Sequence, residues 1–283
     1  GCGAVGSGVL DRVRRRRDLF ALNPVLVRRP EARAGDRRAS FTRQLGEALA
    51  GGPDLIVEMM GGADEPADLM AEALEAGVHV VTANKAAVAK HFERLHDAAR
   101  RGGARLEYAA AVGGGAPMIE TVRRLQPAGV AKLEGVMNGT ANFILSRLGA
   151  GEAFEDALKE AQRLGFAEAD PGADVDGHDA ADKLSILIRE AFGAAVPPER
   201  IAKRSLSEIT PEMCAAAAED GKVYKQIARA WRGAGGAVDA EVTIEPVALS
   251  HPFAGAKNEQ NRALVTDAGG RVHAVYGKGA GRW

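Results

Sequence analysis

The sequence begins Gly1-Cys2-Gly3-Ala4-Val5-Gly6, a G-x-G-x-x-G pattern that runs directly into a helical segment. Such glycines permit a tight turn, a close approach of the backbone to a pyrophosphate, and packing of the helix against a sheet. The pattern normally follows a strand, whereas this sequence starts at its first glycine. We therefore expect a dinucleotide-binding turn in a sheet whose first strand is missing, with a gap at that place.

Short apolar runs alternate with helix-period segments in the first third, which is the pattern of βαβ units. Beyond Ala104 strands and helices follow in a different order. The strands are expected at residues 24–27, 55–57, 79–82, 105–112, 132–137, 240–244, 263–266 and 271–276, and mainly helices between 179 and about 231. The predicted fold class is α/β, with a Rossmann-type parallel sheet, its first strand missing, followed by an α+β domain.

The composition narrows the class of protein. Lys plus Arg total 37 against 38 Asp plus Glu, a formal net charge of -1, so nothing indicates a nucleic-acid partner. A basic run at residues 14–17 suits the C-terminal end of the first helix. The two cysteines are far apart, and no apolar stretch approaches the roughly 18 residues of a membrane helix. We expect a soluble cytoplasmic protein.

A second informative stretch is Glu168-Ala-Asp-Pro-Gly-Ala-Asp174-Val-Asp-Gly-His-Asp179-Ala-Ala-Asp-Lys183, an acidic loop that enters an apolar helical segment. Its carboxylates could hold an ammonium-bearing substrate while Lys183 transfers a proton. On these residues alone, an exposed loop with an ordinary Asp179–Lys183 pair at i,i+4 spacing is the simpler interpretation. An EF-hand is excluded, because Gly172 and Lys183 occupy positions that require acidic ligands.

The end of the second expected strand bears on the choice of cofactor. A dinucleotide fold that prefers NAD carries an acidic residue there, about 20 residues past the glycines, for the ribose 2′-hydroxyl. This chain has Arg28 and Arg29 instead, with Arg33 close by. Arginine binds a 2′-phosphate through charge-assisted bonds, so the sequence favours NADP(H), with NAD(H) use left open. Two ordinary surface arginines are the alternative.

Taken together, the segments resemble homoserine dehydrogenase over nearly the whole chain. The motifs that carry the resemblance, in the family's order, are Gly1-Cys-Gly-Ala-Val-Gly6, Val80-Val-Thr-Ala-Asn-Lys85, Ala111-Val-Gly-Gly-Gly115, Asn138-Gly-Thr-Ala-Asn142, Gly165-Phe-Ala-Glu-Ala-Asp170, Asp174-Val-Asp-Gly-His-Asp179 with Lys183, His251-Pro252 and Tyr276-Gly-Lys-Gly-Ala-Gly281. The resemblance implies reversible, NADPH-dependent reduction of L-aspartate 4-semialdehyde to L-homoserine, a step towards threonine, methionine and isoleucine. It favours a substrate site over a plain acidic loop.

The resemblance also implies a domain organisation. Residues 1–108 correspond to a dinucleotide-binding domain, to which residues 277–283 return. Residues 109–276 correspond to a substrate-binding domain that also forms a homodimer.

Catalytic roles follow from the resemblance alone. Lys183 corresponds to the proton donor to the aldehyde oxygen, and Asp179 to a residue that holds the lysine or the substrate. Lys85 corresponds to a second lysine that lines the site between cofactor and substrate.

The resemblance assigns the binding residues as well. Glu168 and Asp174 correspond to carboxylates that bind the ammonium and hydroxyl ends of the substrate, and Gly139 and Thr140 offer backbone and hydroxyl bonds. The cofactor-binding residues are Gly1, Gly3, Ala4, Val5, Gly6, Arg28, Lys85, Gly165, Gly277 and Gly279. For the last three glycines, turn formation is an equally good account.

Three departures from the family pattern matter. The strand before the glycine loop is absent, and the family continues beyond Trp283, so both ends are expected to be trimmed. The family's glutamate at a monovalent-cation site is Ala109 here, which leaves the carbonyls of Val112, Gly114 and Ala116 for a weak sodium site. These departures keep an alternative open, namely a catalytically silent relative that binds NADP, another ligand or a partner.

Overall fold

The computed structural model describes residues 1–279, which form two compact units: residues 1–108, and a second unit that begins at Ala109. The predicted return of residues 277–283 to the first domain falls partly on the second unit, because Gly277 and Lys278 belong to its last strand. Residues 280–283 lie outside the described residues. Within residues 1–279, no helix is long and apolar enough to cross a membrane.

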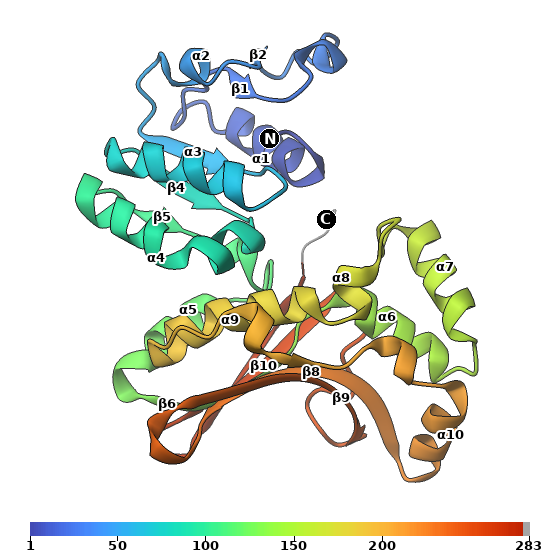
Figure 1. Cartoon of the computed structure of the whole chain (residues 1–283). Helices are drawn as coiled ribbons and strands as arrows, with labels where there is room; N and C mark the ends of the chain where they lie inside the picture. Colours follow the sequence, from blue (N-terminus) through green and yellow to red (C-terminus); the bar gives the residue numbers. More distant parts are fainter. Residues whose placement is uncertain (280–283) are drawn as a thin grey trace. The chain divides into compact units, whose positions relative to one another are not determined.

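The first unit alternates parallel strands with helices (Figure 1). Its elements are α1 (Ala4–Arg15), β1 (Val25–Leu26), η1 (Pro30–Arg33), β2 (Phe41–Thr42), α2 (Leu45–Leu49), β3 (Leu55–Glu58), α3 (Asp64–Glu75), β4 (His79–Thr82), α4 (Lys85–Gly102) and β5 (Leu106–Glu107). Strand β1 pairs with β2, and β3, β4 and β5 form a separate parallel sheet. Among the described residues no pairing joins the two sheets, which is the gap expected without a strand between β1 and β3.

Helix α4 shows how local sequence sets an element in this unit. Asn84 caps its start, with the side-chain oxygen accepting a hydrogen bond from Ala87 N at 3.1 Å. Gly103 ends it in the left-handed conformation, at φ 64°. Leu95 and Val88 are fully buried on its inner face, and burial of such a side chain contributes about 1.5–3 kcal/mol. Local sequence therefore sets both ends of α4.

The second unit contains a larger mixed sheet. Its elements are η2 (Ala109–Ala111), α5 (Met118–Leu125), η3 (Gln126–Ala128), β6 (Val130–Val136), α6 (Gly139–Leu148), α7 (Phe154–Leu164), α8 (Gly172–Val175), α9 (His178–Phe192), η4 (Pro198–Arg200), β7 (Ala202–Lys203), η5 (Leu206–Glu208), α10 (Pro211–Glu219), β8 (Lys222–Arg232), η6 (Ala234–Gly236), β9 (Val238–Ala248), β10 (Gln260–Asp267) and β11 (Val272–Lys278). In the described chain six strands pair in the order β11-β10-β6-β8-β9-β7, and every pair except β7–β9 is antiparallel. The predicted fold class, α/β followed by an α+β unit, is confirmed.

Two expected elements of this region are wrong. The helices expected up to about Trp231 stop at Glu219, and residues 222–232 form the central strand β8. Residues 225–228 of this strand, including Lys225 and Gln226, are buried on both faces, so this part of the sequence lacks the apolar–polar alternation of a half-exposed strand. The strand expected at 105–112 ends at Glu107, where a 3₁₀ turn begins soon after.

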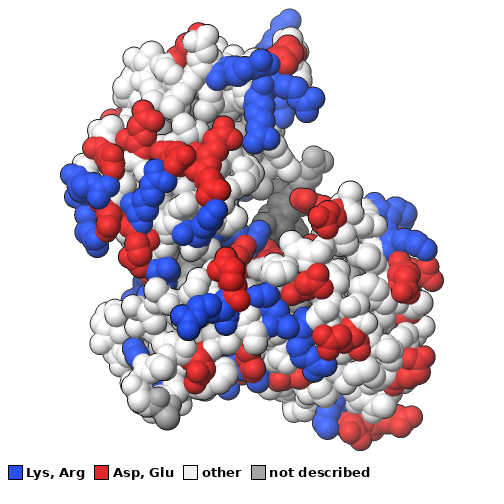
Figure 2. Space-filling model, in the orientation of Figure 1, with Lys and Arg blue, Asp and Glu red and all other residues white. Residues whose placement is uncertain are grey.

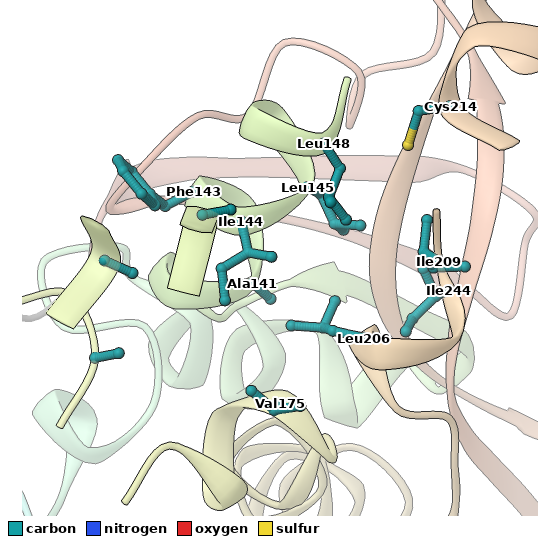
Figure 3. Close-up of a cluster of buried hydrophobic side chains, with 13 residues drawn as sticks. Ala141, Phe143, Ile144, Leu145, Leu148, Val175, Leu206, Ile209, Cys214 and Ile244 are labelled. Carbon is teal, nitrogen blue, oxygen red and sulfur yellow. The ribbon is translucent and has the colours of Figure 1, made fainter. Parts of the chain in front are cut away.

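Helices α5, α6 and α9 lie on one face of the large sheet (Figure 1). The buried core between α6 and its neighbours includes Ile144 and Leu148 of α6 together with Leu206, Ile209 and Ile244 (Figure 3). This packing fixes α6, whose first residues belong to the candidate site described next.

Candidate active site

The glycine loop at the start of α1 contains three motif glycines, of which two have no room for a side chain and one has free space beside it. A Cβ on Gly1 would collide with the carbonyl oxygen of Met59, and a Cβ on Gly6 with that of Gly1. A Cβ on Gly3 would meet nothing within 4 Å. Because Gly3 is the N-cap residue of α1, its open backbone lies at a helix N-terminus, where amides and the helix dipole attract phosphate. The loop therefore fits a pyrophosphate.

A cavity of about 530 Å³ adjoins this loop in the first unit. Besides the glycine loop and residues 59–61 after β3, it is lined by Arg28, Arg29, Arg33 and Arg43. Figure 2 shows Lys and Arg side chains gathered on the side of the first unit that holds α1 and η1. The lining segments follow the carboxyl ends of β1, β2 and β3, which is where open parallel sheets bind ligands.

Buried Glu58 connects the ends of β3 and β4 beside this loop. Its carboxylate accepts hydrogen bonds from Met60 N at 2.5 Å and from the Thr82 hydroxyl. The Thr82 oxygen in turn accepts from Asn84 N at 2.9 Å. Because Asn84 caps α4, this chain of bonds fixes the helix start, where Lys85 is the first, half-buried residue.

In the second unit, Lys183 lies on α9 one turn after Asp179. Its Nζ donates to Asp179 Oδ2 at 2.6 Å and to the carbonyl oxygen of Met137 at 2.7 Å, and its side chain is 16% exposed. An ammonium group carries three hydrogens, so one remains without a partner among the described residues. That hydrogen is available to the oxygen of a bound carbonyl compound.

Two carboxylates beside this lysine share a single amide. Asn138 Nδ2 donates to Asp174 Oδ1 at 2.7 Å and to Asp179 Oδ2 at 2.8 Å. The Thr140 hydroxyl lies 2.6 Å from the carbonyl oxygen of Phe166 and 3.1 Å from Asp174 Oδ2. Burial raises the pKa of Asp174, the Asn138 hydrogen bond lowers it, and the nearby Asp179 charge raises it further. Such a pair of carboxylates suits an ammonium group.

Asn138 opens one of the motifs that carry the family resemblance, but no role in the site was predicted for it from the sequence. Its sequence signal is local only, because an Asn before an apolar helical segment indicates an N-cap. The two carboxylates that it joins lie 36 and 41 residues further along the chain.

The remaining predicted substrate residues have different surroundings. Gly139 is the first residue of α6, and a Cβ there would approach the carbonyl oxygen of Asn258 at 3.3 Å. Glu168 is exposed, and within residues 1–279 its carboxylate has no hydrogen-bond or ion-pair partner. Gly165 ends α7 at φ 79° with nothing within 4 Å of an added Cβ, so the turn itself explains this glycine. Ligand contacts for these residues remain predictions.

The two late glycines are explained by packing within the second unit. A Cβ on Gly277 would lie 2.5 Å from Ala116 Cα. A Cβ on Gly279 would lie 2.9 Å from Asn261 Nδ2. Neither position has room for a side chain, so glycine is needed here whether or not a cofactor approaches.

The predicted cation carbonyls of Val112, Gly114 and Ala116 lie in the segment between η2 and α5. The Ala116 oxygen already accepts a hydrogen bond from Met118 N at 2.7 Å. Among residues 1–279, no three His, Cys, Asp or Glu side chains gather in a way that could hold a metal ion. Sodium binding by the carbonyls stays a prediction.

A chain that combines a parallel α/β unit, in which a glycine with free space beside it lies at a helix N-terminus, with a second unit that holds a lysine among buried carboxylates is typical of a nicotinamide-dependent oxidoreductase. Residues 1–109 match the family model for the homoserine dehydrogenase NAD-binding domain, and residues 117–283 match the model for homoserine dehydrogenase. The chain belongs to the homoserine dehydrogenase family. The first of these matches also supports a nicotinamide cofactor.

Individual relatives agree with the family models. The chain is 36% identical over 299 residues to homoserine dehydrogenase of Synechocystis sp., covering 99% of this chain and 68% of the relative. It is 39% identical over 235 residues to that of Corynebacterium glutamicum, covering 81% and 53%. The crystal structure of a homoserine dehydrogenase from Thiobacillus denitrificans matches with a TM-score of 0.91 at 36% identity, covering 99% of this chain and 68% of that one. The chain thus spans about half to two thirds of these relatives.

Proposed function

We propose that this chain catalyses the reversible reduction of L-aspartate 4-semialdehyde to L-homoserine with NADPH. The observation that carries the proposal is the Lys183 amine, fixed by Asp179 Oδ2 and the Met137 carbonyl with one hydrogen left for a substrate. NADPH, when bound, supplies a hydride to the aldehyde carbon. Lys183 gives a proton to the aldehyde oxygen, so the C=O double bond becomes a CH–OH group. In the reverse direction the neutral lysine takes the hydroxyl proton.

The carboxylates of the second unit orient the substrate in this proposal. Asp174 and Asp179 provide negative charge for the substrate ammonium, and exposed Glu168 contacts it from outside. The first amides of α6, at Gly139 and Thr140, suit the substrate carboxylate because a helix N-terminus attracts anions. One end of the substrate is thereby fixed while the carbonyl oxygen receives the Lys183 proton.

We infer that NADPH is preferred over NADH. Gly3 admits the pyrophosphate, and Arg28 and Arg29 stand in the cavity lining after β1, where the ribose 2′ position is expected. Lys85, at the start of α4, is proposed to contact the cofactor as well. A relative from Pseudomonas canavaninivorans, 36% identical over 211 residues, is named an NAD(+)-dependent homoserine dehydrogenase, so the family includes the other preference.

The test is NADPH oxidation by the purified chain with L-aspartate 4-semialdehyde. Lys183→Ala should lower kcat by about 100- to 10,000-fold and leave the Kd for NADPH unchanged, since proton transfer contributes that much. Lys159→Ala, which changes an exposed lysine on α7, is the matched control and should retain full activity. Turnover by Lys183→Ala at the wild-type rate would remove the lysine from the reaction.

We also propose that a second copy of this chain packs on the sheet face opposite α5, α6 and α9 (Figure 1). That face carries Arg229, which lies 3.4 Å from Glu241 and 3.8 Å from Glu134. It also carries Val272 and Tyr276, whose exposed fractions are 57% and 54%. Sedimentation should give twice the chain mass, and Tyr276→Glu should give the mass of one chain. A wild-type protein that sediments as one chain would contradict this.

A further inference from the structure

We propose that Asn138 is a positioning residue that joins Asp174 to Asp179 and thereby orients Lys183. The inference rests on the proposed function, because it concerns the same site. Asn138 is 4% exposed and follows β6, where the chain turns into α6. It touches neither reacting atom and acts through the carboxylates that it holds.

The orientation of the Asn138 amide is fixed by its surroundings. Its Oδ1 accepts a hydrogen bond from Ala141 N at 2.7 Å and so caps α6. The two Nδ2 hydrogens then point to Asp174 and Asp179. A flipped amide would place its oxygen against two carboxylates and lose the cap, so only one orientation satisfies every partner.

The turn that contains Asn138 also holds the lysine. The carbonyl oxygen of Met137, one residue earlier, accepts from Lys183 Nζ at 2.7 Å, and Asp179 Oδ2 accepts from both Asn138 and Lys183. Displacement of Asp179 would therefore leave the amine with one anchor. The end of β6 thus binds both members of the Asp179–Lys183 ion pair.

A neutral donor is required at this position. Two adjacent carboxylates repel each other, and each needs hydrogen bonds once it is buried. An arginine or lysine would supply them, but its charge would also neutralise the pair and weaken its attraction for a substrate ammonium. The amide provides two donors without a charge. Among the described residues, the charged groups that hydrogen-bond to Asn138 are Asp174 from α8 and Asp179 from α9, and Lys183 of α9 is bonded to Asp179. Uncharged groups lie around them: the Thr140 hydroxyl of α6 is 3.1 Å from Asp174, and the Phe166 carbonyl oxygen after α7 is 2.6 Å from that hydroxyl.

The test compares three variants in two measurements. Asn138→Asp keeps an oxygen for the cap but adds a third carboxylate, and Asn138→Ser keeps a cap oxygen but loses the two-armed donor. The control for the loss of a helix cap is Thr210→Ala. The Thr210 side-chain oxygen accepts a hydrogen bond from Met213 N at 3.3 Å and so caps α10.

In the first measurement, Asn138→Ser should lower kcat/KM about 10- to 100-fold, and Asn138→Asp should move the acid limb of kcat/KM to higher pH. The Kd for NADPH should not change in either variant. Thr210→Ala should keep the wild-type pH profile. If the wild type is active and the pH profile of kcat/KM does not shift in Asn138→Asp, the inference is overturned. A wild type without activity would count against the proposed function only.

The second measurement needs no substrate. Because the Asn138 hydrogen bonds favour ionised carboxylates, their loss should lower the unfolding temperature more at about pH 8 than at about pH 5. Thr210→Ala also removes the hydrogen bond that holds the pKa of Glu212 below its ordinary value, but both pH values lie above that pKa, so this control should lower the unfolding temperature by nearly the same amount at each. If both Asn138 variants lower the unfolding temperature by the same amount at the two pH values, Asn138 acts only as a helix cap and the inference is overturned. This outcome is informative even if the chain has no activity.

Discussion

The two units of this chain build their candidate sites in different ways. The first unit provides main-chain groups and exposed positive charge: a glycine with free space beside it at a helix N-terminus, and arginines that line a cavity. The second unit offers buried side chains joined by hydrogen bonds at 2.6–2.8 Å, in which Asp179 and Lys183 are only 10% and 16% exposed. A backbone site tolerates side-chain changes that neither move its main chain nor fill the space for its ligand, whereas a buried network depends on every member.

The strongest test of this contrast is a substitution that adds a side chain at Gly3. Gly3 has φ -77°, which any residue adopts, and a Cβ there would meet no protein atom within 4 Å. Gly3→Val should therefore fold normally but prevent the close approach of a pyrophosphate, and NADPH affinity should fall by about 100-fold or more. Calorimetric titration measures this loss, and circular dichroism confirms the fold.

Gly8→Ala is the matched control for that prediction. Gly8 lies in α1, is exposed, and has nothing within 4 Å of an added Cβ, so alanine there should leave NADPH affinity unchanged. Its helix propensity should raise stability by about 0.5–1 kcal/mol. Normal NADPH binding by Gly3→Val would show that the loop does not bind the pyrophosphate.

The same contrast explains what the sequence could predict. The glycine loop depends on neighbouring residues, so the spacing of its glycines was sufficient to predict it. The Asn138 network depends on segments 36 and 41 residues away, which local patterns do not relate. Arg43 enters the cavity lining because β2 pairs with β1, and this pairing is absent from local spacing. Strand β8 was missed because burial on both faces removes the alternation.

The second prediction concerns pH and sharpens the contrast, because only the buried site should respond. Burial raises the pKa of Asp174 above its ordinary value, and the ionised form is the one that binds an ammonium. On the acid side, kcat/KM should therefore fall about tenfold per pH unit below that raised pKa, while the NADPH affinity changes little. Steady-state kinetics and titration across the same pH range measure the two responses.

Asp174→Asn gives the corresponding stability test. A carboxyl whose pKa is raised by folding binds its proton more tightly in the folded state, so the folded state loses stability as pH rises through that pKa. The variant cannot ionise and should unfold at a higher temperature than the wild type at about pH 8, with little difference near pH 4. It should also lose most activity. Greater stability of the wild type at pH 8 would show that Asp174 is stabilised as an anion.

The smallest expected effect lies on the exposed rim of the cofactor cavity. Arg43 is 64% exposed and its guanidinium lies 3.2 Å from Glu31, so water competes with any phosphate contact that it makes. Arg43→Ala should lower the preference for NADPH over NADH by about tenfold, through a rise in the KM for NADPH alone. Arg16→Ala, which removes another exposed arginine paired with Asp18, is the control and should change neither KM. An equal rise in the KM for NADPH and for NADH would show that Arg43 shapes the cavity without binding the 2′-phosphate. The rim of the cavity would then depend on its structure more than on its charge, as the buried site does.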